Sequence, residues 1–264
     1  MSILIVGRGF IARAVAAALP DARLLPHDTE PTPALLDGVR AVLWGGRHPS
    51  LGTPEWRLDG DGEPRLAAAL GERDVAFVSL GTRKVYAPAT QPLAEAAPLG
   101  PIDRYGEQKL ALEHRLRTIL GQRLTTLRIA NVIGFEPGRR SFMGAMLGGL
   151  AREGIVRFDM SPFTRRDFVP VQVVGWLIAT LLDAPPGGVL NLGAGFSIEC
   201  GRLALTLIES YGAGALLIDD PRERDAFELD IARLSALTGR VSNREELLAT
   251  VRDCGHRLRE GQGD

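Results

Sequence analysis

The chain has 264 residues and a formal net charge of −1, from 31 lysines and arginines against 32 aspartates and glutamates. This length suits one large domain, or a domain with a smaller lobe, and the near-neutral charge argues against a nucleic-acid partner. The two cysteines, Cys200 and Cys254, suit a reducing compartment, and the sequence has no cysteine or histidine cluster with metal-ligand spacing. The longest strongly apolar run, 173–182, is too short to cross a bilayer, and no export signal opens the chain. We therefore expect a cytoplasmic protein without a metal or a membrane partner.

The first predicted strand, 3–6, runs into a glycine turn and a helix at 10–19. A dinucleotide-binding fingerprint requires this order of strand, turn and helix. Gly7 allows the tight turn, Gly9 lets the backbone approach a pyrophosphate at the helix N-terminus, and Ala12 is small enough for close packing. An ordinary turn would also use glycine for its dihedral angles, but we favour cofactor binding. The cofactor-binding residues expected here are Gly7, Gly9, Phe10, Ile11 and Ala12.

Apolar runs alternate with helical patterns along the rest of the chain, which favours a parallel sheet covered on both faces. Further strands are expected at 22–26, 40–45, 75–80, 124–130 and 188–192, and helices at 64–71, 102–120, 141–153, 171–183, 199–211 and from Asn243 onward. Residues 46–63, rich in glycine, proline and aspartate, are expected to form a loop. Only about twenty residues separate the first helix from the strand near 40, too few for two strand–helix units, so the nucleotide-binding half is expected to be shortened there.

The expected fold class is α/β, a Rossmann-like doubly wound parallel sheet with a small C-terminal substrate lobe. The dinucleotide-binding domain is assigned to 1–134 together with about 166–192. The substrate lobe is assigned to 135–165 and 193–240, and a C-terminal tail to 241–264.

The helix expected at 102–120 carries Tyr105 and Lys109, which are four residues apart and therefore share one face. An ammonium group in that position can lower the pKa of a phenol, so that the tyrosine can exchange a proton with a substrate oxygen. Thr82, just after the strand at 75–80, has a hydroxyl that could hold the same oxygen. A tyrosine–lysine pair at this spacing is common by chance, so its weight depends on the glycine turn that precedes it.

Several segments in this order resemble the short-chain dehydrogenase/reductase superfamily, and within it the extended branch of nucleotide-sugar epimerases, dehydratases and reductases. Besides the glycine turn and the YGEQK segment at 105–109, the similar segments are 77–86, 127–134, 166–171 and 191–195. The resemblance covers roughly residues 1–211. It implies a small-molecule substrate, and NAD or NADP as the cofactor.

Position by position, the resemblance implies that Tyr105 is the general acid/base and that Lys109 both lowers its pKa and binds the nicotinamide ribose. Thr82 would orient the substrate oxygen. Asn131 would face the substrate, although it could also fasten a loop. Arg166 would hold a substrate phosphate, with a structural ion pair as the alternative.

The same resemblance assigns Gly45 and Gly46 to the room needed by the nicotinamide ribose. Asp28 lies where an acidic residue binds either the ribose hydroxyls of NAD or the adenine, and the shortened chain leaves both assignments open. Nucleotide-sugar 4,6-dehydratases carry Asp-Glu directly after the threonine, whereas this chain has Arg83 and Lys84, which argues against that type. These two cations could meet an anionic substrate, but a solvated surface face is the commoner explanation.

The function that follows is hydride transfer at a sugar carbon, in an epimerase or reductase acting on a nucleotide sugar. Two alternatives are a non-catalytic NAD(P)-binding sensor or scaffold, and a reductase of a small carbonyl compound without a nucleotide. The apolar stripe on the helix at 102–120 could pair two chains into a homodimer, or could pack on the chain's own sheet.

Overall fold

The computed structural model describes residues 2–261. Its centre is a sheet of six strands in the order β2-β1-β3-β4-β5-β9, with every neighbouring pair parallel. Most of their residues are buried and apolar, because helices cover both faces of the sheet. The strands are β1 (Ser2–Val6), β2 (Arg23–Leu25), β3 (Val39–Trp44), β4 (Ala76–Thr82), β5 (Leu124–Ile129) and β9 (Gly188–Leu192). The predicted Rossmann-like α/β class is confirmed.

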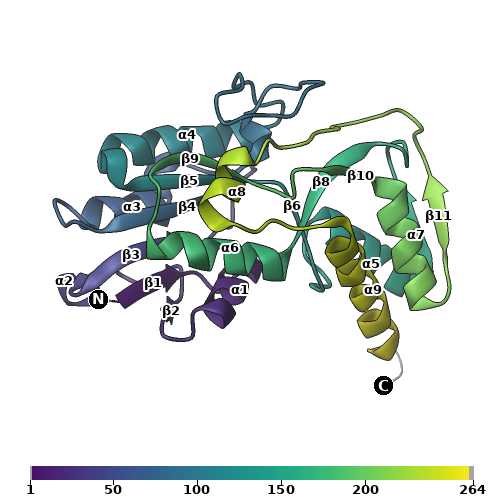
Figure 1. Cartoon of the computed structure of the whole chain (residues 1–264), viewed down its shortest axis with the longest axis horizontal. Helices are drawn as coiled ribbons and strands as arrows, with labels where there is room; N and C mark the ends of the chain where they lie inside the picture. Colours follow the sequence, from purple (N-terminus) through teal and green to yellow (C-terminus); the bar gives the residue numbers. More distant parts are fainter. Residues whose placement is uncertain (1, 262–264) are drawn as a thin grey trace.

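Helices α1 (Phe10–Ala18) and α6 (Val171–Asp183) cover one face of this sheet, and α3 (Gly62–Ala69) and α4 (Arg104–Leu120) cover the other (Figure 1). Alternate side chains of each strand therefore enter different cores. In β1, Ile5 belongs to the core under α1 and α6, whereas Leu4 belongs to the core under α3 and α4. Helix α4 also contributes to the interior of the chain: its residues Leu112, Leu116 and Leu120 are buried.

The shortened nucleotide-binding half is also confirmed. Only α2 (Pro33–Leu36), a single turn, connects β2 to β3, and β2 is the edge strand of the sheet. Short 3₁₀ turns follow at Leu58–Gly60 (η1), Arg83–Val85 (η2) and Gly121–Arg123 (η3). The region 46–63 is thus a loop only up to η1, because α3 begins at Gly62.

A second core lies beside the carboxyl ends of the sheet strands (Figure 1). Its elements form a three-stranded sheet, a two-stranded sheet and the helices around them. They are β6 (Asn131–Ile133), α5 (Phe142–Glu153), β7 (Ile155–Phe158), β8 (Arg165–Pro170), β10 (Ser197–Glu199), α7 (Cys200–Tyr211), β11 (Ala215–Ile218) and α9 (Arg244–Glu260). Helix α9 buries Leu247, Val251 and Cys254 in this core, so that much of 241–261 packs with the lobe. Helix α8 (Ala232–Thr238) packs near β9 and α6.

Each helix and strand expected from the sequence is present, with ends within about two residues of the expected ones. The short strands of the lobe, α2 and α8 were not anticipated. Within residues 2–261, no helix has the length and apolar character needed to cross a membrane. The same residues include no group of three or more side chains suited to hold a metal ion. Cys200 and Cys254 are both buried and not bonded to each other.

Candidate active site

A cavity of about 710 Å³ opens at the carboxyl ends of the sheet strands and extends toward the lobe. This is the edge at which open parallel sheets bind their ligands. Ten of the thirteen site residues expected from the sequence line it: Gly9, Phe10, Ile11, Gly45, Gly46, Thr82, Tyr105, Lys109, Asn131 and Arg166. They come from six separate elements and loops, so the fold brings together side chains that are far apart in the sequence.

Gly7 and Ala12 support the wall of this cavity from behind. Gly7 has a φ of +110°, and a Cβ there would lie 2.4 Å from the backbone N of Gly46. A Cβ on Gly45 would lie 2.8 Å from the Cβ of Ala12. The turns after β1 and β3 therefore fit together only because these residues are small, and Gly9 then begins α1 without a side-chain cap.

The N-terminus of α1 thus presents free backbone N–H groups to the cavity, which is the arrangement that holds a phosphate group. These residues fit the diphosphate of a dinucleotide, since Gly9 places no side chain between the first N–H groups of α1 and the cavity that it lines. Asp28 is different: it is exposed, follows β2, and is not among the residues lining the cavity. Its neighbour His27 packs nearer, because a Cβ on Gly46 would lie 2.7 Å from the Cβ of His27.

Helix α4 holds Tyr105 and Lys109 at the cavity. The helix begins at an N-cap, Asp103, whose carboxylate accepts the N–H of Gly106 at 2.8 Å. Tyr105 is half-buried in the first turn. Lys109, one turn later, is only 7% exposed, and its Nζ donates to the carbonyl oxygen of Leu80 at 2.8 Å. The ammonium group is therefore fixed by β4.

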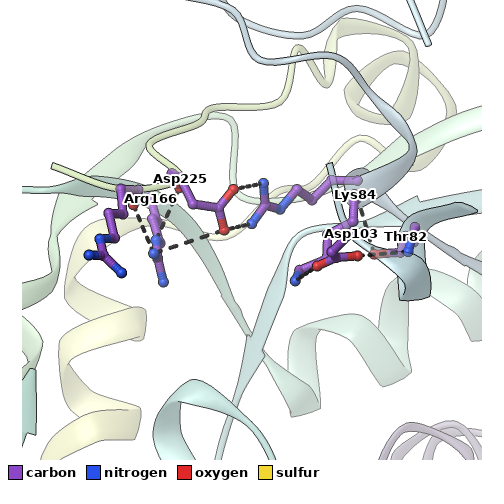
Figure 2. Close-up of polar contacts among 8 residues, drawn as sticks. Thr82, Lys84, Asp103, Arg166 and Asp225 are labelled. Atoms are coloured by element: carbon purple, nitrogen blue, oxygen red, sulfur yellow. Dashed lines mark hydrogen bonds and ion pairs between the residues drawn. The ribbon is translucent and has the colours of Figure 1, made fainter. Parts of the chain in front are cut away.

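Thr82 is the last residue of β4 and is buried at the wall of the cavity. Its hydroxyl accepts the backbone N–H of Lys84 at 3.3 Å, and the side chain of Lys84 pairs with Asp103 (Figure 2). Burial opposes ionisation of Asp103, but the hydrogen bonds from Lys84 and Gly106 outweigh it, so that the pKa of Asp103 is lowered. The end of β4 and the start of α4 are thereby tied together.

Arg83 and Arg166 share one carboxylate, that of Asp225 (Figure 2). Arg83 is only 8% exposed; both of its terminal nitrogens donate to Asp225, and its guanidinium stacks on Phe227, 3.8 Å from the ring centroid. Arg166 donates to the backbone oxygens of Arg224 and Asp225, at 2.8 and 3.1 Å, with the Asp225 carboxylate 3.9 Å away.

The interpretation of Arg83 as a solvated surface residue is therefore wrong, because the residue is buried between the two parts of the molecule. For Arg166, the alternative of an ion pair with a nearby carboxylate is present in the structure. Arg166 nevertheless lines the cavity, and two of its nitrogens are used by backbone oxygens. Asp225 has a φ of 59°, the only positive φ outside glycine in residues 2–261. Its backbone conformation is uncommon for a residue with a side chain.

Cations dominate the lining of the cavity, a feature that the sequence analysis missed. Seven of them, Arg47, Arg83, Lys84, Lys109, Arg139, Arg140 and Arg166, stand against two carboxylates, Glu136 and Asp225. The guanidinium of Arg47 lies 5.3 Å from the centroid of the Tyr105 ring, and that of Arg139 lies 4.7 Å from the Phe10 ring. Burial is the main reason why the pKa of Arg139 is lowered. The site is therefore suited to a ligand with several negative charges. Four of these cations, Arg83, Lys84, Lys109 and Arg166, were considered in the sequence analysis, whereas Arg47, Arg139 and Arg140 were not.

This geometry defines a doubly wound α/β protein in which a glycine turn typical of dinucleotide-binding proteins shares one cavity with Tyr105 and Lys109. A family model confirms the class: residues 52–193 match the NAD dependent epimerase/dehydratase family. The match covers more than half of the chain, which therefore belongs to this family of NAD-dependent enzymes. A comparison with curated protein sequences found no match.

Solved structures share the whole fold at low sequence identity. A UDP-N-acetylglucosamine 4-epimerase from Methanobrevibacter ruminantium M1 aligns with a TM-score of 0.82 and 16% identity, over 99% of this chain and 98% of that one. A UDP-glucuronic acid 4-epimerase from Bacillus cereus, solved with UDP-glucuronic acid and NAD, aligns with a TM-score of 0.78 and 19% identity, over 98% and 100%. The NDP-hexosamine 5,6-dehydratase TunA gives 0.78 and 23%, over 100% and 98%. These similarities extend over the lobe as well as the central sheet.

Proposed function

We propose that the chain catalyses hydride transfer at a sugar carbon of a nucleotide sugar, using NAD or NADP, with Thr82, Tyr105 and Lys109 as its catalytic residues. The observation that carries this proposal is that the three side chains line the same cavity as the glycine turn of α1. A bound nicotinamide would supply the hydride acceptor or donor. Gly9 and the first N–H groups of α1 would hold its diphosphate, and Lys109 would hold its ribose.

Tyr105 is the proton-transfer group in this mechanism. When the sugar is oxidised, its phenolate oxygen takes the proton of the sugar hydroxyl, and when the ketone is reduced it returns that proton. Thr82 donates a hydrogen bond to the same sugar oxygen and fixes its direction. The ammonium of Lys109, held by Leu80, favours the phenolate form by its positive charge.

The charge of the cavity supports a nucleotide sugar over a small uncharged carbonyl compound. A sugar nucleotide carries a diphosphate, which several arginines in one cavity can bind by charge-assisted hydrogen bonds. Two of the structural neighbours described above are UDP-sugar epimerases. The 4,6-dehydratase reaction is disfavoured because Arg83 and Lys84 stand at the positions of its acid pair, and neither side chain can act as a carboxylic acid.

The test uses purified protein, NADH and NADPH, and a panel of UDP- and TDP-sugars. We expect cofactor binding by tryptophan quenching, and turnover with at least one sugar nucleotide. Tyr105→Phe should keep cofactor binding but lower kcat by about 10²–10⁴-fold. Tyr211→Phe, which changes a tyrosine of α7 that does not line the cavity, is the matched control. Near wild-type turnover in Tyr105→Phe would refute the mechanism, and binding without turnover on any sugar nucleotide would favour the non-catalytic sensor.

A further inference from the structure

A buried carboxyl group, that of Glu63, lies near the part of β4 that holds the proposed catalytic lysine. Glu63, in the first turn of α3, is only 1% exposed. Its Oε1 accepts a hydrogen bond from the hydroxyl of Ser79 at 2.6 Å. Ser79 directly precedes Leu80, whose carbonyl oxygen holds the ammonium of Lys109. Helices α3 and α4 lie next to each other on the same face of the sheet (Figure 1), so Glu63 and Lys109 share one buried layer.

The other charges in this layer already have partners of their own. Asp61, the N-cap of α3, accepts the backbone N–H of Glu63 at 3.0 Å and an indole N–H at 2.9 Å. Glu113 of α4 pairs with Arg128 of β5 at 2.9 Å. Among the described groups acting electrostatically on Glu63, Lys109 is the one that favours its ionised form, while Asp61 and Glu113 oppose it.

Glu63 changes its charge near neutral pH. Burial raises the pKa of Glu63 to about 7, against the opposing effects of Lys109 and Ser79. A buried ammonium needs a compensating charge, and a carboxylate at Glu63 supplies part of it within the buried layer. Lys109 is thus connected to Glu63 through Ser79 and Leu80, and it lines the same cavity as Tyr105.

We propose that Glu63 is a positioning residue that, together with Ser79, balances the charge of Lys109 and so sets how strongly this ammonium favours the phenolate form of Tyr105. The proposal rests on the proposed function, because it needs Lys109 to act on Tyr105. When Glu63 is ionised, part of the lysine's field is compensated and the phenol keeps its proton to higher pH. When Glu63 is protonated, the whole positive charge acts on Tyr105.

If the role of Glu63 were purely structural, replacing it would leave the ionisation of Tyr105 unchanged. An acidic residue in the first turn of a helix is stabilising by itself, and its removal would then change only the unfolding temperature. The distinguishing quantity is the pH at which half of the Tyr105 phenol is ionised. It can be measured in the free protein by phenolate absorbance, because the chain has only three tyrosines.

The experiment titrates the wild type, Glu63→Gln and Glu107→Gln, each with a Tyr105→Phe partner whose absorbance is subtracted. Removing the buried charge should lower the Tyr105 midpoint by on the order of one pH unit, as expected for charges interacting through a protein interior. Glu107 is exposed on α4 two residues from the tyrosine, and its charge is screened by water. Its variant should shift the midpoint much less. If Glu63→Gln does not fold, Glu63→Leu replaces it.

Lys109→Met separates the two proposals. A raised midpoint in Lys109→Met with an unchanged midpoint in Glu63→Gln would overturn the role of Glu63 while leaving the proposed function in place. Unchanged midpoints in both variants would show that the lysine does not act on the tyrosine, and both proposals would then fall. A lowered midpoint in Glu63→Gln, with a raised one in Lys109→Met, supports both.

Discussion

Raising the pH through neutrality is expected to destabilise the chain through Glu63. The pKa of Glu63 lies near 7 in the folded chain because of burial, and at 4.5 in a solvated reference state. A group with a raised folded pKa binds more protons in the folded state, so its contribution to stability is complete below the unfolded pKa. It is then lost as the pH rises toward the folded pKa.

The size of the effect follows from the difference between these two values. A shift of about 2.5 pH units at 1.36 kcal/mol per unit corresponds to about 3 kcal/mol in all. By the linkage relation, most of this stability, about 2.5 kcal/mol, is lost as the pH rises from about 5 to about 8.5. Glu63→Gln keeps the shape of the side chain and cannot ionise, so this part of the pH dependence should disappear in the variant.

Urea unfolding of both proteins across this pH range, followed by tryptophan fluorescence, measures the difference. The comparison of slopes isolates Glu63, because other buried groups titrate in both proteins. Asp167, whose pKa burial also raises to about 7, is the main such group. Below about pH 7 Glu63 is uncharged in the wild type as well, so the substitution does not change the charge next to Lys109 in that part of the range. Parallel stability curves for the two proteins would refute the reasoning.

Three further predictions concern the architecture of the site. Gly7→Ala should abolish NADH quenching, because its Cβ would lie 2.4 Å from a facing backbone N at a φ of +110°; intact quenching would contradict the close contact of the two turns. Arg128→Met should cost about 3–5 kcal/mol in urea unfolding by leaving Glu113 buried without its partner, and adding Glu113→Leu should restore most of it. Asp225→Asn should cost on the order of 2 kcal/mol, because a nearly buried guanidinium loses its bidentate partner. An unchanged urea midpoint would show that this pair is not stabilising.

The parts of the site that the sequence could predict are those encoded by neighbouring residues. The glycine turn depends on Gly7 and Gly9, two residues apart, between an apolar strand and an alanine-rich helix. The relation of Tyr105 to Lys109 depends only on helix periodicity. The N-cap of that helix is likewise encoded by one residue, Asp103, of a type that commonly caps helices. Local patterns of this kind need no knowledge of the tertiary fold.

The electrostatic partners could not be predicted, because each depends on a distant segment. Arg83 reaches a carboxylate 142 positions later in the chain, in a segment between β11 and α8 where the sequence predicts no helix or strand. Residues 61–63 have the composition of a loop and end the loop predicted at 46–63, so nothing in the sequence marks Glu63 as buried. Its burial follows from the packing of α3 against α4, which is a tertiary property.

Three consecutive residues at the end of β4 connect the parts of the active site. Thr82 lines the cavity, Arg83 binds Asp225 on the lobe, and Lys84 binds Asp103 at the start of α4. The Arg83–Asp225 pair is largely buried and therefore contributes more than an exposed pair of the same geometry would. The side chains of Lys84 and Asp103 are each 37% exposed, so water partly screens their attraction. The side chains that differ from the dehydratase pattern thus have a defined role: they hold the proposed proton-transfer helix and the lobe to the same strand end.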